Sequence, residues 1–154
     1  GVPPSSVLDV GAGVGMWRDW YRAQHPRVKV RSVDISEHAC AQWGHELRDI
    51  ATWKPSKKFD LVICHGVLHY LDEPAAVSAI ANLGAATRNV LYLELPTAHD
   101  LAEVVDPELT DMDVHHRSGE WYRSRLNVHF QQAGAGLRVR HGTVPLYELE
   151  SAPP

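Results

Sequence analysis

Cysteine is scarce in this chain of 154 residues, which contains only Cys40 and Cys64. The two do not form a C-x-x-C pair, so the usual zinc and dithiol motifs are excluded and a reduced chain is expected. Long apolar runs are missing as well, since none approaches the roughly 20 residues of a membrane helix. No basic stretch followed by an apolar one opens the chain, so a secretory signal is not indicated. We therefore expect a cytoplasmic protein with no membrane association.

Excess positive charge is also missing, because the formal net charge is −4. This argues against duplex nucleic acid as a partner. The charge is uneven, with seven acids and no Lys or Arg in residues 94–113, then five Arg and one acid in residues 117–140. Two interpretations stay open, namely solvated helix faces or a substrate rim with polarity.

Apolar, β-branched runs alternate with helical patterns along a chain long enough for one domain, residues 1–154. The expected strands cover residues 7–10, 28–33, 46–50, 59–64, 89–95, 137–140 and 146–150. The expected helices run from residue 16 to Pro26, from 36 to 43, from 72 to 84 and from 118 to about 133. This alternation predicts an α/β fold, a doubly wound, seven-stranded, mostly parallel sheet. About five residues join the last two strands, too few for a parallel crossover, so an antiparallel last strand is expected.

The stretch "VLDVGAGVGMW" combines a buried strand with three glycines and the start of a helix. Glycines at such a strand end let the backbone approach a ligand and open a helix N-terminus toward it. A dinucleotide site has the pattern G-x-G-x-x-G, but Met16 stands at its last position, and a phosphate loop would need a lysine that is missing. A tight turn without any ligand is the alternative.

Motifs at the later strand ends favour a ligand site. "VDIS", "RDI" and "FDLVICHGVLHYL" follow the glycine stretch in that order, and "NVLYLELP" comes next. Together these motifs resemble the class I S-adenosylmethionine-dependent methyltransferases, over nearly the whole chain. The resemblance implies a Rossmann-like methyltransferase fold, with S-adenosyl-L-methionine as the cofactor and S-adenosyl-L-homocysteine as its product. The antiparallel last strand is also typical of that family.

The resemblance also implies roles for individual residues around the cofactor. The glycine loop, with Gly11, Ala12 and Gly13, would lie under the methionine part, and Asp9 would order the loop and reach the amino group. The ribose hydroxyls would bind Asp34, and adenine would contact Ile35, Asp49 and Ile50. The backbone carbonyl of Cys64 or His65 would face the methionine ammonium. Cys64 itself is expected to be a small core residue.

The acceptor side of the site offers several candidates. His69 resembles the catalytic His of small-molecule O-methyltransferases and is the candidate general base, although a wall of the cofactor pocket is the favoured role. The residues expected to reach the acceptor are Glu94, His115, His116, Trp121 and Tyr122. For Trp121 and Tyr122 core packing is the favoured interpretation, and an aromatic wall for the acceptor is the alternative. Asp111 and Asp113 with the two His residues suggest a divalent metal, but a polar loop is the favoured interpretation, and no metal is expected.

The sequence therefore predicts a methyltransferase that acts on O or N of a small-molecule or exposed acceptor. An inactive or partner-dependent cofactor-binding module is the alternative, and a nicotinamide oxidoreductase is disfavoured by Met16. Most family members have one or two helices before the first strand, whereas only residues 1–6 precede it here. We therefore expect an N-terminal cap to be lacking, and the pocket to be open or covered by a partner chain or a missing segment.

Overall fold

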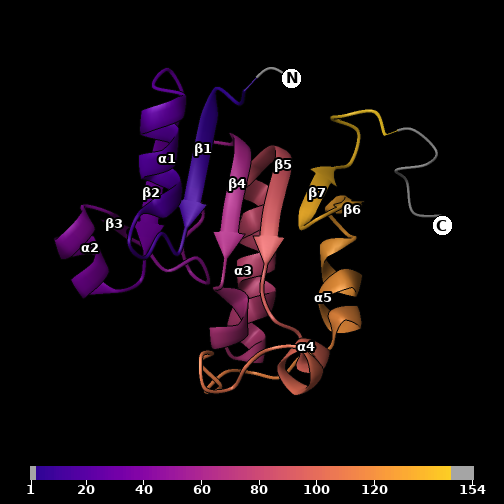
Figure 1. Ribbon diagram of the computed structural model, residues 1–154. Helices are drawn as coiled ribbons and strands as arrows, with labels where there is room; N and C mark the ends of the chain where they lie inside the picture. The colour runs from indigo at the N-terminus through magenta and orange to yellow at the C-terminus, as the bar shows by residue number, and fades with distance from the viewer. Residues whose placement is uncertain (1–2, 147–154) are drawn as a thin grey trace.

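The computed structural model describes residues 3–146 (Figure 1). Its strands are β1 (Ser6–Val10), β2 (Lys29–Asp34), β3 (Glu46–Leu47), β4 (Phe59–His65), β5 (Thr87–Glu94), β6 (Phe130–Gly134) and β7 (Leu137–Arg140). Its helices are α1 (Met16–Gln24), α2 (Glu37–Trp43), η1 (Leu68–Tyr70), α3 (Glu73–Ala86), α4 (Ala98–Glu103) and α5 (Gly119–Leu126). Among the described residues, no helix is both long and apolar enough to cross a membrane.

The strands form one sheet in the order β3-β2-β1-β4-β5-β7-β6. The first five strands are parallel, and β7 runs antiparallel to both β5 and β6. The seven-stranded, mostly parallel sheet with an antiparallel last strand is thus confirmed. In Figure 1, β1, β4 and β5 end at the same edge of the sheet, the lower one in this view, and α4 lies on that side. This carboxyl edge is where open α/β sheets bind ligands.

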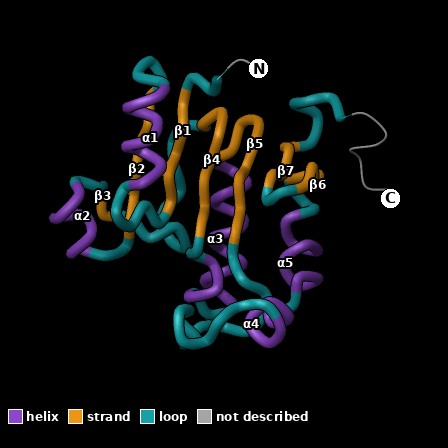
Figure 2. Tube along the Cα trace, viewed as in Figure 1, coloured by secondary structure: helices purple, strands orange, loops and turns teal. Residues whose placement is uncertain are grey.

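Helices cover the two faces of the sheet unequally (Figure 2). On one face, Val7 and Ile63 pack with Tyr21 of α1. The other face carries the larger core, in which the sheet packs against α3 and α5. Its fully buried members include Leu8, Val62, Leu83, Leu91, Leu126 and Phe130. The central strands are therefore held rigidly, and so are the positions at which they end.

Local capping explains where the helices begin. The side chains of Ser36, Asp72 and Ser118 each accept a hydrogen bond from a backbone N–H three residues on, at 2.9–3.2 Å. These caps satisfy donors that a helix start leaves unpaired, and all three were expected from the sequence. Helix α3 continues past Gly84 to Ala86, contrary to expectation. A Cβ at Gly84 would lie 2.6 Å from the ring of His129, so this glycine permits close packing instead of ending the helix.

Two expectations near the end of the chain are wrong. The helix expected over residues 118–133 ends at Leu126, and residues 130–134 form β6 instead. Three residues with positive φ, Gly134, Ala135 and Gly136, turn the chain from β6 into β7, so the "AGAG" stretch makes a hairpin and does not end a helix.

The strand expected over residues 46–50 is shorter than expected and covers only Glu46–Leu47. The strand expected at 146–150 lies, apart from Leu146, outside the described residues.

Candidate active site

The loop between β1 and α1 is built on three glycines in the left-handed region. Gly11, Gly13 and Gly15 have φ values of 70°, 53° and 83°. The carbonyl of Val33 accepts hydrogen bonds from the N–H groups of Gly11 and Ala12, at 2.9 and 3.1 Å. A Cβ at Gly11 would lie 2.3 Å from Cγ2 of Val67. The loop therefore needs glycine both for its backbone angles and for the close approach of Val67.

Two buried residues that the sequence did not reveal hold this loop from behind. The imidazole of His45 lies between the Ser32 hydroxyl, at 2.9 Å, and the Gly13 carbonyl, at 3.0 Å. Arg18, 7% exposed, contacts His45 and donates to the Trp43 carbonyl. Both roles depend on tertiary contacts between α1, β2 and the start of β3, so no local motif indicates them. The glycine loop is thus fixed before any ligand arrives.

Asp9, on β1 directly before the loop, is a buried carboxylate that lacks a full set of partners. It is 2% exposed, and its Oδ2 contacts no hydrogen-bond donor within residues 3–146. Burial raises the pKa of Asp9 to about 6, against the opposing effect of the nearby Arg18 charge, and the Asp34 carboxylate raises it further. An orphaned buried acceptor is costly, so this position suits a cationic group or a hydrogen-bond donor of a ligand.

The residues expected around ribose and adenine lie together beside the loop. A narrow cleft is lined by Val10, Gly11, Ile35, Arg48, Asp49, Ile50, Val67 and Leu71. Asp34 is 9% exposed at the end of β2, whereas the neighbouring Ile35 is 63% exposed at the mouth. Asp49 accepts a hydrogen bond from the Ala51 N–H at 2.8 Å. The cleft encloses only 40 Å³ in this conformation. Four of the expected residues thus line this cleft, Gly11, Ile35, Asp49 and Ile50, and Asp34 contacts the adjoining loop through the Gly13 N–H.

A second hollow, here called the edge cavity, opens at the carboxyl ends of β4 and β5. It has a volume of 360 Å³ and is lined by His65, Gly66, Glu94, Leu95, Pro96, Asp100, Val104 and Val105. His65 and Glu94 are direct neighbours in the sheet, and the Glu94 carboxylate accepts a hydrogen bond from the Tyr92 hydroxyl. No Lys or Arg belongs to this lining. Buried Cys64 lies behind it, and burial raises the pKa of that thiol to about 12, which leaves it unreactive.

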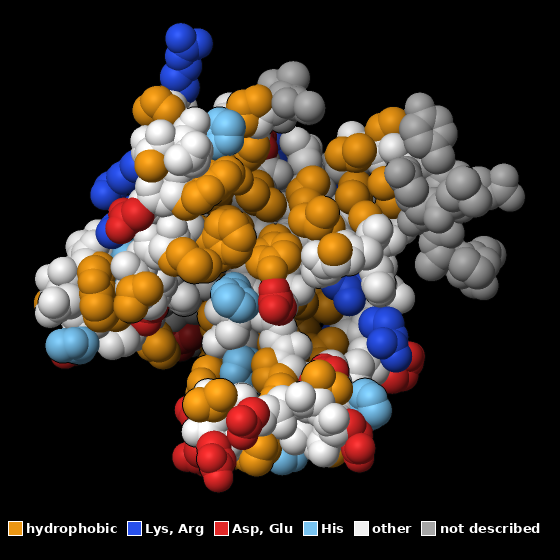
Figure 3. Space-filling model, viewed as in Figure 1, with side chains coloured by type: hydrophobic (Ala, Val, Ile, Leu, Met, Phe, Trp, Pro, Cys, Tyr) orange, Lys and Arg blue, Asp and Glu red, His pale blue; other side chains and the backbone are white. Residues whose placement is uncertain are grey.

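Acidic side chains dominate the surface around this cavity (Figure 3). They belong to α4 and the segment that follows it, and the exposed ones are Glu103, Asp106, Glu108, Asp111 and Asp113. The seven acids noted in the sequence therefore gather largely on one lobe, at the carboxyl edge of the sheet.

His69 lies in η1, beneath this lobe, and is 5% exposed. Its Nδ1 has no hydrogen-bond partner within the described part of the chain. Burial lowers the pKa of His69, and the Asp111 charge opposes that shift. The backbone of His115 donates to the His69 carbonyl at 2.8 Å, which ties the acidic segment to η1. His69 is not part of the lining of the edge cavity, so it packs behind the surface that an acceptor would contact.

The other expected acceptor residues are dispersed. Trp121 packs between the guanidinium groups of Arg117 and Arg125, and its Nε1 donates to Glu73 at 3.3 Å. Tyr122 is 4% exposed and belongs to the main core. His115 and His116 are exposed and line neither the cleft nor the edge cavity. Within residues 3–146, no three His, Cys, Asp or Glu side chains are grouped as metal ligands.

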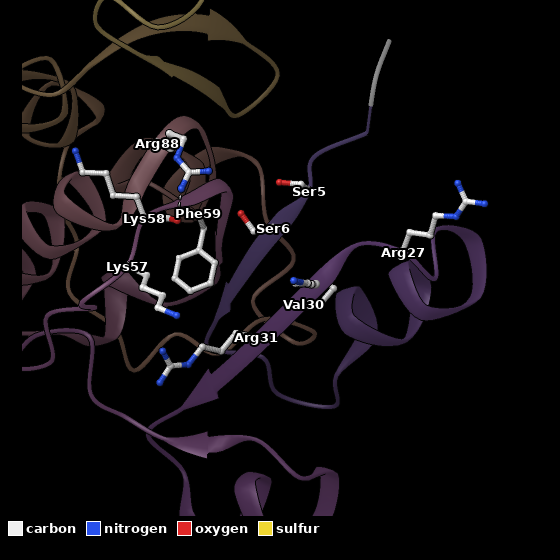
Figure 4. Close-up of a pocket in the computed structure, with 10 residues that line it drawn as sticks. Ser5, Ser6, Arg27, Val30, Arg31, Lys57, Lys58, Phe59 and Arg88 are labelled. Atoms are coloured by element: carbon white, nitrogen blue, oxygen red, sulfur yellow. Dashed lines mark hydrogen bonds between the residues drawn. The ribbon is translucent and has the colours of Figure 1, made fainter.

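A larger hollow of 610 Å³ lies at the opposite, amino edge of the sheet (Figure 4). Basic side chains surround it, but Figure 4 shows Arg27 and Lys58 on opposite sides, pointing away from each other. Arg31 and Arg88 are paired with Glu46 and Asp60. This hollow is remote from the glycine loop and lies at the edge that α/β sheets do not use for ligands.

Comparison with known proteins agrees with this geometry. A family model described as a methyltransferase domain matches residues 2–151. The chain belongs to this methyltransferase family. Among curated proteins, it is 33% identical over 85 residues to methyltransferase tpcM of Aspergillus fumigatus, a match that covers 49% of this chain and 27% of tpcM.

Solved structures of similar fold are methyltransferases as well. The plantazolicin methyltransferase BamL, solved with a triazolic desmethylPZN analog and S-adenosyl-L-homocysteine (SAH), has a TM-score of 0.68 and 18% identity over 82% of this chain and 54% of BamL. The N-methyltransferase NodS of Bradyrhizobium japonicum, solved with S-adenosyl-L-homocysteine, has a TM-score of 0.60 and 17% identity over 90% of this chain and 79% of NodS. The chain thus spans about a quarter of tpcM and about half of BamL.

Proposed function

We propose that this chain binds S-adenosylmethionine and transfers its methyl group to an oxygen or nitrogen atom of a small-molecule or exposed acceptor in the edge cavity. The observation that carries the proposal is the unpartnered, buried Oδ2 of Asp9, directly under a loop of three left-handed glycines. A methionine ammonium would supply the missing donor and the missing positive charge. A nicotinamide dinucleotide would offer only phosphates near that carboxylate, which it would repel.

The rest of the cofactor fits the residues beside the loop. Each Asp34 oxygen accepts one backbone N–H and keeps a further lone pair for a ribose hydroxyl. Ile35 and Ile50 flank the cleft as apolar surfaces for adenine, and Asp49 can accept from its amino group. The assignments of Ala12 to the loop contact and of the Cys64 or His65 carbonyl to the ammonium remain part of the same proposal.

The cleft must widen for this ligand. Ligand pockets typically measure about 300–1,000 Å³, and the cleft encloses 40 Å³. Val67 and Leu71 form its far wall, on either side of η1, while Gly11 and Ile35 form the near wall. Gly66 lies directly before this wall and has a φ of 68°. Glycine adopts positive and negative φ angles about equally easily, so the backbone can change conformation at this position. We therefore propose that η1 shifts away from the glycine loop when the cofactor binds.

The edge cavity suits an acceptor that is neutral or cationic. Its charged groups are the carboxylates of Glu94 and Asp100, and its remaining lining is largely apolar. When bound, S-adenosylmethionine supplies an electrophilic methyl group, and the chain supplies alignment and a place for the acceptor proton. His65 lines the cavity, and His69 lies behind it as the second candidate base. His65 can take the proton that an oxygen or nitrogen acceptor loses, whereas His69 can do so only where the proposed shift of η1 exposes its imidazole.

Calorimetry with S-adenosylmethionine, S-adenosylhomocysteine and NAD tests the cofactor assignment. We expect the first two to bind and NAD not to bind. Saturation at about 100 times the dissociation constant should also stabilise the fold by about 2.7 kcal/mol. A folded sample that binds neither adenosyl ligand would overturn the proposal.

A partner-dependent cofactor-binding module is a second candidate, favoured by the dispersal of the expected acceptor residues, since His115, His116 and Trp121 line neither the cleft nor the edge cavity. In that case a second chain would complete the acceptor site. Transfer of a radiolabelled methyl group to a panel of amines and phenols separates the two candidates. Turnover by the chain alone supports the enzyme, whereas cofactor binding without turnover favours the module.

A further inference from the structure

Two arginines share a cavity that the proposed methyl transfer does not use. This α5 cavity, of 270 Å³, lies between the ends of β5 and β7 and helix α5. Its lining is Leu93, Glu94, Leu95, Thr97, Gly119, Tyr122, Arg123, Leu126, Gln132, Gly136 and Arg138. Arg138 comes from β7, opposite Leu91 in the ladder, and Arg123 comes from α5. Two unrelated elements thus bring two guanidinium groups to one hollow.

Arg138 lacks a counter-ion within residues 3–146. Its Nη1 is buried without a hydrogen-bond partner. Burial lowers the pKa of Arg138, and the positive charge of Arg123 lowers it further. Arg123 has one carboxylate partner, Glu120, at 3.3 Å on the exposed side of α5. Arg138 is half-buried, and a guanidinium with a buried, unpaired Nη1 beside a second cation is unfavourable unless an anion joins them.

The backbone near Arg123 leaves room for this arrangement. A Cβ at Gly119 would lie 2.8 Å from Nη1 of Arg123, so a larger residue there would displace the guanidinium. Gln132 adds a side-chain amide to the lining. These groups can donate several hydrogen bonds to one planar or tetrahedral anion.

The α5 cavity adjoins the edge cavity, because Glu94 and Leu95 line both. The edge cavity offers carboxylates and no Lys or Arg, and the α5 cavity offers two guanidinium groups. One ligand that spans both would place an anionic group near the arginines and a neutral or cationic group near Glu94 and Asp100. Opposite charges in adjoining cavities fix the orientation of such a ligand.

We propose that the acceptor carries a carboxylate or phosphate group that binds Arg123 and Arg138, and that this anchor directs its methylated atom into the edge cavity. The inference rests on the proposed methyl transfer, since it assigns the substrate class of that site. It makes Arg123 and Arg138 specificity-determining residues that do not touch the reacting atoms.

The test measures binding of three probes to the SAH-saturated protein by calorimetry. Benzoate and phenyl phosphate carry the two candidate anions, and benzyl alcohol is a neutral control of similar shape. We expect both anions to bind more tightly than the alcohol, and the tighter of the two to identify the anchor. Arg138→Met should weaken anion binding by about tenfold or more. Arg123→Met should act in the same direction, and Arg27→Met, at the amino edge, should bind as the wild type does.

Melting temperature gives a second readout that does not depend on affinity. Because Nη1 of Arg138 is buried and unpaired beside another cation, Arg138→Met should melt at or above the wild-type temperature without ligand, and the anions should no longer raise it. Equal binding by wild type and Arg138→Met, or no preference for the anions over benzyl alcohol, would overturn the inference.

The same samples separate this inference from the proposed function. If the anions show no effect but SAH still binds, the proposed anion anchor is wrong and the proposed cofactor site stands. If SAH does not bind, but the ligand-free protein still binds the anions in a manner that depends on Arg138, the proposed methyl transfer is wrong and the anion site stands.

Discussion

The carboxylate of Asp34 accepts a hydrogen bond from the backbone N–H of Gly13, with 2.9 Å between Oδ2 and the nitrogen. Its other oxygen accepts from the Ser36 N–H at 2.8 Å. One side chain at the end of β2 therefore joins the glycine loop to the start of α2. In the proposed complex, the same carboxylate would also bind the ribose, so its position and that of the loop are coupled.

Replacement of Asp34 tests this coupling. Asp34→Ala leaves two backbone N–H groups without their acceptor and removes the proposed ribose contact, so SAH affinity should fall by about tenfold to a hundredfold. Asp34→Asn keeps one acceptor oxygen and should lose less. Calorimetry gives the affinities, and circular dichroism checks that both variants are folded. The exposed Asp106→Asn is a matched control and should bind normally. If SAH binds Asp34→Ala with unchanged affinity, the ribose is bound by a residue other than Asp34.

Asp9 should make the stability of the ligand-free protein fall as the pH rises from about 4 to 6. In this window the folded carboxyl, with its pKa raised from 3.8 to about 6, still holds a proton that the unfolded chain has released. A difference of about two pKa units corresponds to about 3 kcal/mol of lost stability above pH 6.

Asp9→Asn should remove most of this pH dependence and unfold at a higher temperature at pH 7.5, while binding S-adenosylmethionine more weakly. Thermal unfolding between pH 4 and 7.5 measures the first effect, and calorimetry measures the second. A variant with the pH dependence of the wild type would contradict the burial effect on the Asp9 pKa. If Asp9→Asn binds S-adenosylmethionine with wild-type affinity, Asp9 does not bind the methionine ammonium.

Gly11 and Val67 form a steric pair across the cleft. Gly11→Ala places a Cβ at 2.3 Å from Val67 Cγ2 and forces alanine into a φ of 70°. The left-handed conformation alone costs about 1–2 kcal/mol. We expect lower stability and weaker SAH binding. The double variant Gly11→Ala with Val67→Ala should recover the stability that the clash with Val67 removes. It should not recover the stability that the left-handed backbone at position 11 removes. Chemical denaturation and calorimetry on both proteins measure this, and no recovery in the double variant would show that Val67 does not limit the cleft.

Local signals account for the part of the site that was predicted from the sequence. The glycine loop, the acids at strand ends and the caps at Ser36, Asp72 and Ser118 each depend on a few adjacent residues, so short patterns indicate them. The roles of Ile35, Asp49 and Ile50 beside the loop were implied by the family resemblance. The parallel sheet edge then brings these residues together.

Tertiary contacts account for the part that could not be predicted. The support of the loop by His45 and Arg18 joins three elements, and no pattern near either residue indicates it. The stretch Phe130–Gly134 contains one strand-favouring residue, Phe130, so its pairing with β7 is decided by the hairpin and not by strand propensity. For Trp121 the sequence allowed core packing or an aromatic acceptor wall; the residue lines neither the cleft nor the edge cavity, and two arginines and Glu73 of α3 contact it.

His69 decides whether the chain uses a general base from η1. Burial lowers its pKa below the usual 6.5, so the imidazole is neutral and able to accept a proton at pH 7. If His69 is the base, His69→Ala should depress the rate with little change in SAH affinity. The wild-type rate should then rise with pH through the lowered pKa and level off near neutrality. His65→Ala is the matched comparison, because His65 lines the edge cavity and is exposed.

Initial rates between pH 5 and 8 for the wild type, His69→Ala and His65→Ala distinguish the roles of the two histidines. A flat profile with a near-wild-type rate in His69→Ala would leave His69 as a buried wall of η1, whose carbonyl holds the His115 backbone. Catalysis would then depend on placement in the edge cavity, and an amine delivered as its free base would need no general base at all.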